Sequence, residues 1–201
     1  MVRPTLEIEN NLKKQGYKYV IGVDEAGRGS LALGVVAAAV CISNDFDISE
    51  INDSKKMSAK KRALLYDKIT KECDYSIKYV DEKMIDSINI LEATKLAMRQ
   101  CIYDVNYVDF VLIDGNFRID NIDIDQRSVI RGDSLAASIA AASILAKHYR
   151  DALVMEYHKQ LPIYEWDKSK TYGTKRHKEL IKLYGPSIHH RRSFKGVKEY
   201  L

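Results

Sequence analysis

Short runs of β-branched and aromatic residues alternate along this chain with longer segments of helical period, and this alternation restricts the fold more than any other feature. The runs that predict strands are residues 17–23, 35–42, 75–80 and 107–113. The segments that predict helices are residues 58–73, which open with Ser58 as N-cap, 90–103, 134–158 and 174–183. Because the strands come first and then alternate with helices, the sequence predicts an α/β sheet layered with helices.

The 201 residues contain no repeat, low-complexity tract or flexible linker, so we expect one domain over residues 1–201. The longest apolar run, residues 31–42, is too short to cross a bilayer, and the N-terminus lacks the apolar stretch of a secretion signal. These features predict a cytoplasmic protein that does not associate with membranes. Cys41, Cys73 and Cys101 are widely spaced and odd in number, which predicts buried, reduced thiols.

The net charge of +4 is distributed unevenly along the chain. Residues 168–201 contain ten Lys and Arg but only two Glu, whereas the first 167 residues carry a net charge of −4. A basic C-terminal segment of about residues 160–201 is typical of a protein that grips a polyanion such as nucleic acid. It is equally compatible with a solvated tail.

Carboxylates stand at the ends of two apolar segments. Asp24 and Glu25 follow the first predicted strand and precede AGRG, and Asp114 follows FVLI and precedes a Gly-Asn turn. Carboxylates in such places cost free energy unless a cation or hydrogen bonds compensate them. Consecutive strand residues point to opposite faces, so Asp24 and Glu25 reach one ion only if the strand ends or bulges there. An acidic turn without a ligand is the alternative.

Asp133 stands before the longest predicted helix, where it is compatible with a metal ligand or with an N-cap. Four carboxylates without His or Cys partners would suit Mg²⁺ or Mn²⁺ rather than zinc. Such a cluster indicates phosphoryl chemistry.

Six strings occur in a fixed order along the chain: GVDEAGRG, NDSKKMS, VLIDGN, GDSLAASIAAASILAKHYRD, TYGTKRH and HHRRSF. Together they resemble bacterial ribonuclease HII over about residues 19–194. The resemblance implies a ribonuclease H-like mixed β-sheet flanked by helices, with a C-terminal helical extension. It also implies an endonuclease that hydrolyses RNA in RNA/DNA hybrids and at single ribonucleotides embedded in duplex DNA. The cut would fall on the 5′ side of the ribonucleotide and leave 3′-hydroxyl and 5′-phosphate ends.

The resemblance places the family's acidic cluster on Asp24, Glu25, Asp114 and Asp133, the four carboxylates already singled out. They would hold Mg²⁺ or Mn²⁺ in a two-ion mechanism that needs no protein nucleophile. Their arrangement without metal is left open, because like-charged carboxylates often reposition when cations bind.

The resemblance also implies substrate-binding residues. It places a loop that meets the ribose on Gly27, Arg28 and Gly29, and a tyrosine that packs against the sugar on Tyr172. The basic residues expected to contact phosphates are Lys55, Lys56, Lys147, Lys175, Arg176, Arg191 and Arg192. The histidines expected to lie at the surface or to face phosphates, without a catalytic role, are His177, His189 and His190.

The chain departs from the family pattern in two places. It reads SLALGVV where the family usually reads PLAGPVV, with Ser30, Leu33 and Gly34 at the altered positions. Losing both prolines removes φ restraints, which predicts looser substrate binding with the chemistry intact. Thr171 replaces a glycine before Tyr172 and disfavours a positive φ, so the placement of the tyrosine is left open.

Two other hypotheses are compatible with the sequence. One is a ribonuclease H-like nuclease that acts on DNA without ribose selectivity, and the other is a catalytically silent protein that binds hybrids through its basic end. In each case the partner is nucleic acid. We expect a monomer with no obligate protein partner, and we see no convincing peptide for docking on a replication clamp.

Overall fold

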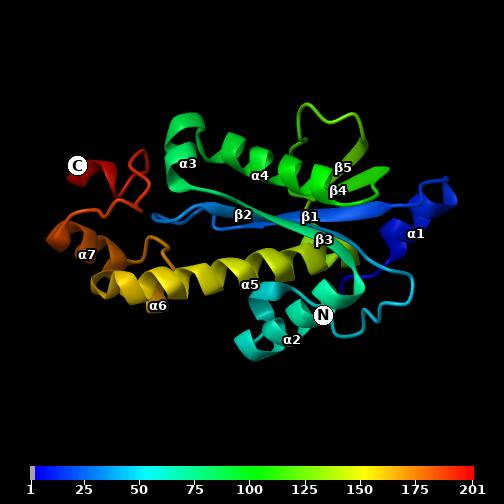
Figure 1. Ribbon diagram of the computed structural model, residues 1–201, viewed down its shortest axis with the longest axis horizontal. Helices are drawn as coiled ribbons and strands as arrows, with labels where there is room; N and C mark the ends of the chain where they lie inside the picture. The colour runs from blue at the N-terminus through cyan, green and yellow to red at the C-terminus, as the bar shows by residue number, and fades with distance from the viewer. Residues whose placement is uncertain (1–2) are drawn as a thin grey trace.

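The computed structural model describes residues 3–201 and shows a five-stranded mixed sheet between two layers of helices (Figure 1). The strands are β1 (Val20–Ala26), β2 (Val35–Cys41), β3 (Asp74–Val80), β4 (Phe110–Asp114) and β5 (Asp125–Val129). Their order across the sheet is β3-β2-β1-β4-β5. β2 is antiparallel to β1 and β3, while β4 is parallel to β1 and β5. The expected mixed α/β sheet is confirmed.

The helices form a layer on each face of the sheet and a group at one end. They are α1 (Glu7–Lys14), α2 (Ala59–Glu72), α3 (Glu82–Ile88), α4 (Ile90–Asp104), α5 (Ala137–Gln160), α6 (Trp166–Ser169) and α7 (Lys175–Tyr184). In Figure 1, α4 lies over one face, α5 and α2 lie under the other, and α6 and α7 lie at the left end with the C-terminus. Among residues 3–201, no helix combines the length and apolar character needed to cross a membrane.

Successive side chains of each strand point to opposite faces of the sheet and pack into two separate hydrophobic cores. The core on the α4 side contains Ile21, Val23 and Ile113. The core on the α5 side contains Val36 and Ala38. Strand positions at even numbers in β1 and β4 therefore face α5, and odd positions face α4.

Helix α5 lies unusually close to β1. A Cβ on Gly22 would lie 2.2 Å from backbone atoms of Ser138 and Ile139, so only glycine permits this approach. The small alanines of the first half of α5 are fully buried and allow the helix to keep this distance. As a result, the next turns of α5 carry Ser143 and Lys147 past the last residues of β1, which include the carboxylates Asp24 and Glu25.

Element boundaries differ from the sequence-based expectation where side chains replace ladder hydrogen bonds. β1 begins at Val20 rather than at residue 17, because the Asp109 carboxylate accepts hydrogen bonds from the N–H groups of Lys18 and Tyr19. The long helix begins at Ala137 rather than at residue 134, because residues Gly132–Ser134 form a separate 3-10 turn. The sequence reading missed α1, α3 and the short edge strand β5, whose exposed polar residues give little apolar pattern.

The residues of the C-terminal segment, 160–201, pack around the loop that follows β1. Ser30 and Tyr172 form one bridge, and Ala32 and His190 form a second. The helix expected at residues 174–183 is confirmed as α7, whose N-cap Thr174 accepts a hydrogen bond from the N–H of His177. The segment is thus tied to the loop at two separate points along its length.

The cysteines are all free thiols, as expected, but only one is buried. Cys101 lies on the buried face of α4, where its Sγ contacts the carbonyl oxygen of Ala37. Cys41 and Cys73 are partly exposed, so the expectation of burial was wrong for them. Each lies at the end of an element, where packing is incomplete.

We expect Glu9→Ala to lower the free energy of unfolding by about 1–3 kcal/mol. Helix α5 has no side-chain cap of its own, and Glu9 of α1 supplies one: its Oε1 accepts hydrogen bonds from the N–H of Ser138 at 2.9 Å and from its Oγ at 2.7 Å. Urea unfolding would measure the loss. The exposed neighbour Glu7 is the control, and an equal loss in Glu7→Ala would contradict the capping role.

Candidate active site

The paired carboxylates Asp24 and Glu25 lie within β1, not after it. β1 pairs regularly with β2 through Ala26, with Asp24 opposite Ala38 and Glu25 opposite Ala37, so the strand neither ends nor bulges at the carboxylates. Regular alternation directs the two side chains to opposite faces of the sheet, but both line the same pocket near the end of the strand. Asp24 faces α5 and is only 4% exposed. Asp114 ends β4 one residue after the Val23–Ile113 pair, which places it beside Asp24 on the same face.

Each of the four carboxylates has its own partner. Asp24 accepts the N–H of Glu25 at 2.7 Å, and Glu25 lies 3.6 Å from the Arg28 guanidinium. Asp114 accepts the N–H of Gly132 at 2.7 Å, and Asp133 lies 3.3 Å from the ammonium group of Lys55. Among residues 3–201, no three His, Cys, Asp or Glu side chains converge closely enough to hold an ion. Mutual repulsion explains why these side chains do not close on one point by themselves.

Asp133 lies in the 3-10 turn Gly132–Ser134 and does not cap α5, whose N-cap position is Ala136. The alternative of an N-cap role is therefore excluded. Its side chain is directed toward Lys55 of the 3-10 turn Ser54–Lys56. This turn and the turn before α5 thus meet at the carboxylates.

Burial makes negative charge costly at this site. It raises the pKa of Asp24 well above its usual value, and the charges of Glu25 and Asp114 add to the effect. Burial also raises the pKa of Glu25 to about 7, against the opposing charge of Arg28. The pKa of Asp114 is raised by burial and by Asp133. A set of buried oxygen donors whose negative charge Arg28 and Lys55 compensate only in part fits a hard divalent cation such as Mg²⁺ or Mn²⁺.

Most of the site residues expected from the sequence line one pocket of about 380 Å³. Its lining residues are Asp24, Glu25, Ala26, Gly27, Arg28, Gly29, Ser54, Lys55, Asp114, Ser143, Lys147 and Tyr172. Asp133 does not line the pocket but pairs with Lys55, which does, and the buried Arg191 lies outside it. Larger hollows beside α4 and beside β5 contain no such combination of acids, basic residues and a glycine loop.

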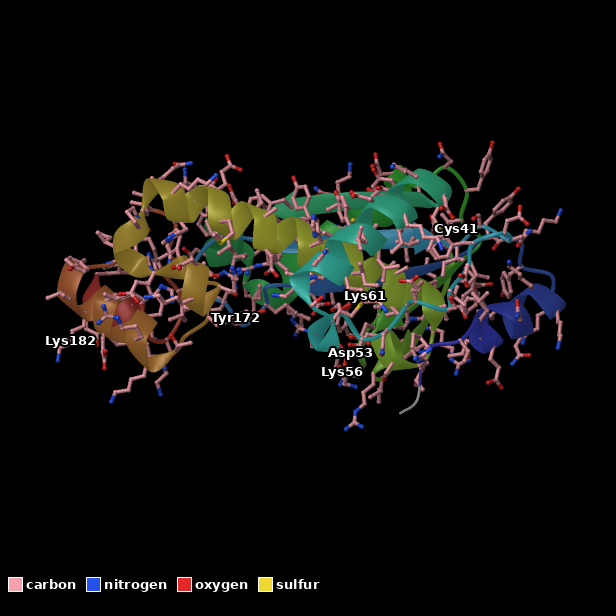
Figure 2. The ribbon with its side chains drawn as sticks, turned by 90° about the horizontal axis from the view of Figure 1, so that it is seen from below. Cys41, Asp53, Lys56, Lys61, Tyr172 and Lys182 are labelled. Atoms are coloured by element: carbon pink, nitrogen blue, oxygen red, sulfur yellow. The ribbon has the colours of Figure 1, made fainter. Side chains whose placement is uncertain are left out.

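Tyr172 lies directly across the glycine loop. A Cβ on Gly29 would lie 4.0 Å from the Tyr172 ring, and the N–H of Leu31 donates to the carbonyl oxygen of Thr171 at 2.8 Å. The ring is 38% exposed and faces the pocket. Figure 2 shows Tyr172 beside the C-terminal helices, with Asp53 and Lys56 further along the same side of the molecule. The fold thus joins two motifs that are more than 140 residues apart in the sequence.

Thr171 has a φ of +67°, so this position does use the left-handed region. Its strain is offset by Arg150, which donates to the Thr171 hydroxyl at 2.8 Å. Arg150 fits there because Gly27 has no side chain: a Cβ on Gly27 would lie 1.9 Å from the Arg150 Nε. Leu33, also at a position where the family has glycine, has a φ of +61° and is buried beside Trp166. Tertiary contacts therefore stabilise the departures from the family pattern.

The basic residues expected at phosphates divide into three groups. Lys55 and Lys147 line the pocket, and Lys147 is held by Asp151 at 2.7 Å. Lys56, Lys175, Arg176 and Arg192 are exposed away from the pocket lining. Arg191 contradicts the expectation, because its side chain is fully buried and donates only to backbone carbonyl oxygens.

The expectation that the histidines lie at the surface is wrong for His177 and His190, which are both fully buried. The Trp166 indole can only donate, so its 2.9 Å hydrogen bond makes the His177 Nε2 an acceptor. The protonated Nδ1 of His177 then donates to the carbonyl oxygen of Tyr172 at 3.0 Å. The Ser187 N–H donates to Nδ1 of His190, whose Nε2 faces His177 at 3.2 Å. This network of neutral rings anchors the backbone of Tyr172.

We expect the His177–His190 pair to make folding sensitive to acid. Burial lowers the pKa of both rings, that of His190 to about 3. Below the ordinary histidine value near 6.5 the unfolded chain binds protons that the folded protein does not, so the pair lowers stability as pH falls from 7 to 5. The slope from two protons is at most about 2.7 kcal/mol per pH unit.

Urea unfolding at pH 5, 6 and 7 would measure this effect against the variant His177→Gln/His190→Gln. The wild type should lose more stability than the variant between pH 7 and pH 5. Parallel pH dependences in the two proteins would contradict the assignment.

Two serines of the site were not predicted from the sequence. The hydroxyl groups of Ser54 and Ser143 are hydrogen-bonded at 2.9 Å. Ser143 also lies beside the Asp24 carboxylate, where its hydrogen bond opposes the rise in the pKa of Asp24. The signal was the spacing within α5, because Ser143, Lys147 and Asp151 follow one another every four residues on one helix face.

Buried carboxylates on neighbouring strands of a mixed sheet, crossed by a long helix, belong to a protein of the ribonuclease H fold. Two solved structures share this fold. The Pyrococcus horikoshii ribonuclease H2 matches with a TM-score of 0.74 at 22% identity, covering 91% of this chain and 97% of that chain. The ribonuclease HII in a PCNA complex from Archaeoglobus fulgidus matches with a TM-score of 0.75 at 22% identity, covering 89% and 96%.

The sequence comparisons narrow the class to one family. The family model described as Ribonuclease HII matches residues 21–197. Ribonuclease HII of Endomicrobium trichonymphae is 44% identical, covering 96% of this chain and 93% of the relative. Ribonuclease HII of Caldicellulosiruptor bescii is 47% identical, covering 94% and 92%. The chain belongs to the ribonuclease HII family and is an endonuclease of the ribonuclease H type, a group of enzymes that bind RNA/DNA hybrids and depend on divalent metal ions.

Proposed function

We propose that this endonuclease cuts on the 5′ side of ribonucleotides, both in RNA/DNA hybrids and at single ribonucleotides embedded in duplex DNA. The products would carry 3′-hydroxyl and 5′-phosphate ends. One observation carries the proposal: a single pocket joins the buried carboxylates to the glycine loop and to Tyr172. Acids that suit metal-assisted hydrolysis thus lie beside a surface that can distinguish ribose from deoxyribose.

The carboxylates of Asp24, Glu25, Asp114 and Asp133 would hold Mg²⁺ or Mn²⁺. When bound, these ions would activate water and stabilise the departing 3′-oxygen. Lys55 and Lys147 supply positive charge at the pocket wall for the phosphates of the substrate.

The glycine loop and Tyr172 are the part of the pocket suited to the sugar. Gly29 leaves the backbone uncovered, so a ribose can approach it closely, whereas Arg150 fills the space beside Gly27. The exposed Tyr172 ring offers an apolar face across from Gly29. Arg28 is partly exposed and can turn from Glu25 to a phosphate oxygen when cations neutralise the acids.

Cleavage of end-labelled duplexes tests the proposal. A DNA duplex with one ribonucleotide should be cut once, on the 5′ side of that residue, with Mg²⁺ or Mn²⁺, and an all-DNA duplex should stay intact. Equal cutting of the all-DNA duplex would favour a DNA nuclease without ribose selectivity. Salt-sensitive binding without any cutting would favour a silent hybrid-binding protein.

We further propose that the enzyme acts as a monomer without an obligate protein partner, in the cytoplasm, where the proposed DNA substrate lies. The Archaeoglobus neighbour was solved together with PCNA, so a sliding clamp is the partner to test first. Size-exclusion chromatography of the protein alone and with a clamp would measure its oligomeric state and whether it binds the clamp.

A further inference from the structure

The glycine loop, residues 27–29, begins the longer loop of residues 27–34 that joins β1 to β2. The guanidinium group of Arg191 lies under this longer loop and binds both of its ends. Nη1 donates to the carbonyl oxygen of Arg28 at 2.8 Å, and Nη2 donates to that of Gly27 at 2.7 Å. At the far end of the loop, Nε donates to Leu33 at 2.8 Å and Nη2 to Gly34 at 3.0 Å. The side chain is fully buried, so it cannot contact substrate itself.

The position of Arg191 is fixed from its own backbone. Its N–H donates to the carbonyl oxygen of Leu31 at 2.8 Å, and the neighbouring residue His190 bridges to Ala32. The Phe194 ring packs on the guanidinium group at 5.0 Å. Burial lowers the pKa of Arg191 to about 9, which leaves the group charged at neutral pH.

The contacts of Arg191 determine where the loop's N–H groups point. In a planar trans peptide the C=O and N–H bonds point in opposite directions, and no peptide bond among residues 3–201 is cis. Because the carbonyl groups of Gly27 and Arg28 point inward to Arg191, the N–H groups of Arg28 and Gly29 point outward. Those residues line the pocket. Within the described part of the chain, neither N–H has a hydrogen-bond acceptor.

We propose that Arg191 is a positioning residue for ribose recognition: it orients the Gly27–Arg28 and Arg28–Gly29 peptides so that their free N–H groups face the ribonucleotide 2′-hydroxyl. This inference rests on the proposed function. The charge of the guanidinium group also polarises both peptides, which makes their N–H groups stronger donors. Lysine carries the same charge but lacks the planar fork that reaches four carbonyl groups at once.

Ribose discrimination in binding tests the proposal. The dissociation constants for a one-ribonucleotide duplex and for an all-DNA duplex of the same sequence would be measured by fluorescence anisotropy. Asp24→Asn protein would be used so that the substrate stays intact, with and without the further change Arg191→Lys. We expect Arg191→Lys to weaken binding of the ribonucleotide duplex by about tenfold and to leave binding of the DNA duplex unchanged.

Lys182→Met is the matched control, because it removes a positive charge from an exposed site on α7 in the same C-terminal segment (Figure 2). It should leave the discrimination ratio unchanged. Equal weakening of both duplexes by Arg191→Lys would instead support a general phosphate or structural role and overturn the proposal, as would an unchanged ratio. If the parent protein itself does not discriminate, the proposed function has failed rather than this inference.

A measurement on the unmodified protein covers the case in which Arg191→Lys does not fold. In amide NMR spectra without divalent ions, the one-ribonucleotide duplex should shift the Arg28 and Gly29 N–H resonances more than the all-DNA duplex does. Equal shifts with the two duplexes would overturn the proposal.

Discussion

Asp24→Asn is expected to reduce cleavage of a one-ribonucleotide duplex by roughly a thousandfold or more and, at the same time, to stabilise the metal-free protein. Asp24 is buried beside Glu25 and Asp114, and burial and these charges raise its pKa. An amide keeps the shape but removes the charge that would hold a cation. Removing a buried, uncompensated charge should raise the free energy of unfolding on the order of 1–3 kcal/mol.

The measurements are initial cleavage rates with Mg²⁺ or Mn²⁺ and urea unfolding in a chelator. Asp123→Asn provides the matched control, because Asp123 is an exposed aspartate outside the pocket and should change neither quantity. A variant that keeps its activity, or that loses stability without metal, would show that Asp24 is not part of an acidic metal site.

The same carboxylates give the metal-free protein a pH dependence of known sign. Glu25 has a pKa raised to about 7, so between about pH 7 and pH 5 the folded protein binds protons that the unfolded chain does not. Stability from this group therefore rises as pH falls through that range, opposite to the effect of His177 and His190. Adding a divalent cation should remove the rise, because the carboxylates then stay ionised.

Gly22→Ala is expected to have the largest effect on folding, with a loss of more than about 3 kcal/mol or no folded protein at all. The added Cβ would lie 2.2 Å from the backbone of Ser138 and Ile139, and backbone atoms cannot turn aside as a side chain can. Moving α5 outward would also uncover the alanines that pack under β2. Thermal unfolding followed by circular dichroism would measure the loss.

Gly16→Ala separates this clash from ordinary glycine effects. Gly16 has a φ of +106° but no atom within 4 Å of the added Cβ, so the substitution should cost only about 1 kcal/mol. A cost at Gly22 no greater than the cost at Gly16 would mean that α5 does not lie on β1 at the described distance.

Much of the fold could be predicted because period and composition report local environment. A few consecutive residues were enough to predict α2, which has Ser58 as its N-cap, the strand β2, and α7, which follows Thr174. The edge strand β5 was not predictable, since its alternately exposed residues are polar. The start of β1 was missed because Asp109, ninety residues away, takes the hydrogen bonds of that backbone.

The sequence alone singled out the candidate residues for the chemistry. Asp24, Glu25 and Asp114 stand out because ionised groups beside apolar strands demand compensation, a property of local sequence. Only the tertiary structure decided which residues from distant motifs are buried together and which hydrogen bonds they form. Arg191 looks like a phosphate-binding arginine in HHRRSF, yet it is buried under a loop more than 150 residues away. Burial and hydrogen-bond partners depend on contacts between residues distant in sequence, which no local pattern records. Because of these contacts, Arg191, His177 and His190 are not at the surface but are buried and hydrogen-bonded inside the protein.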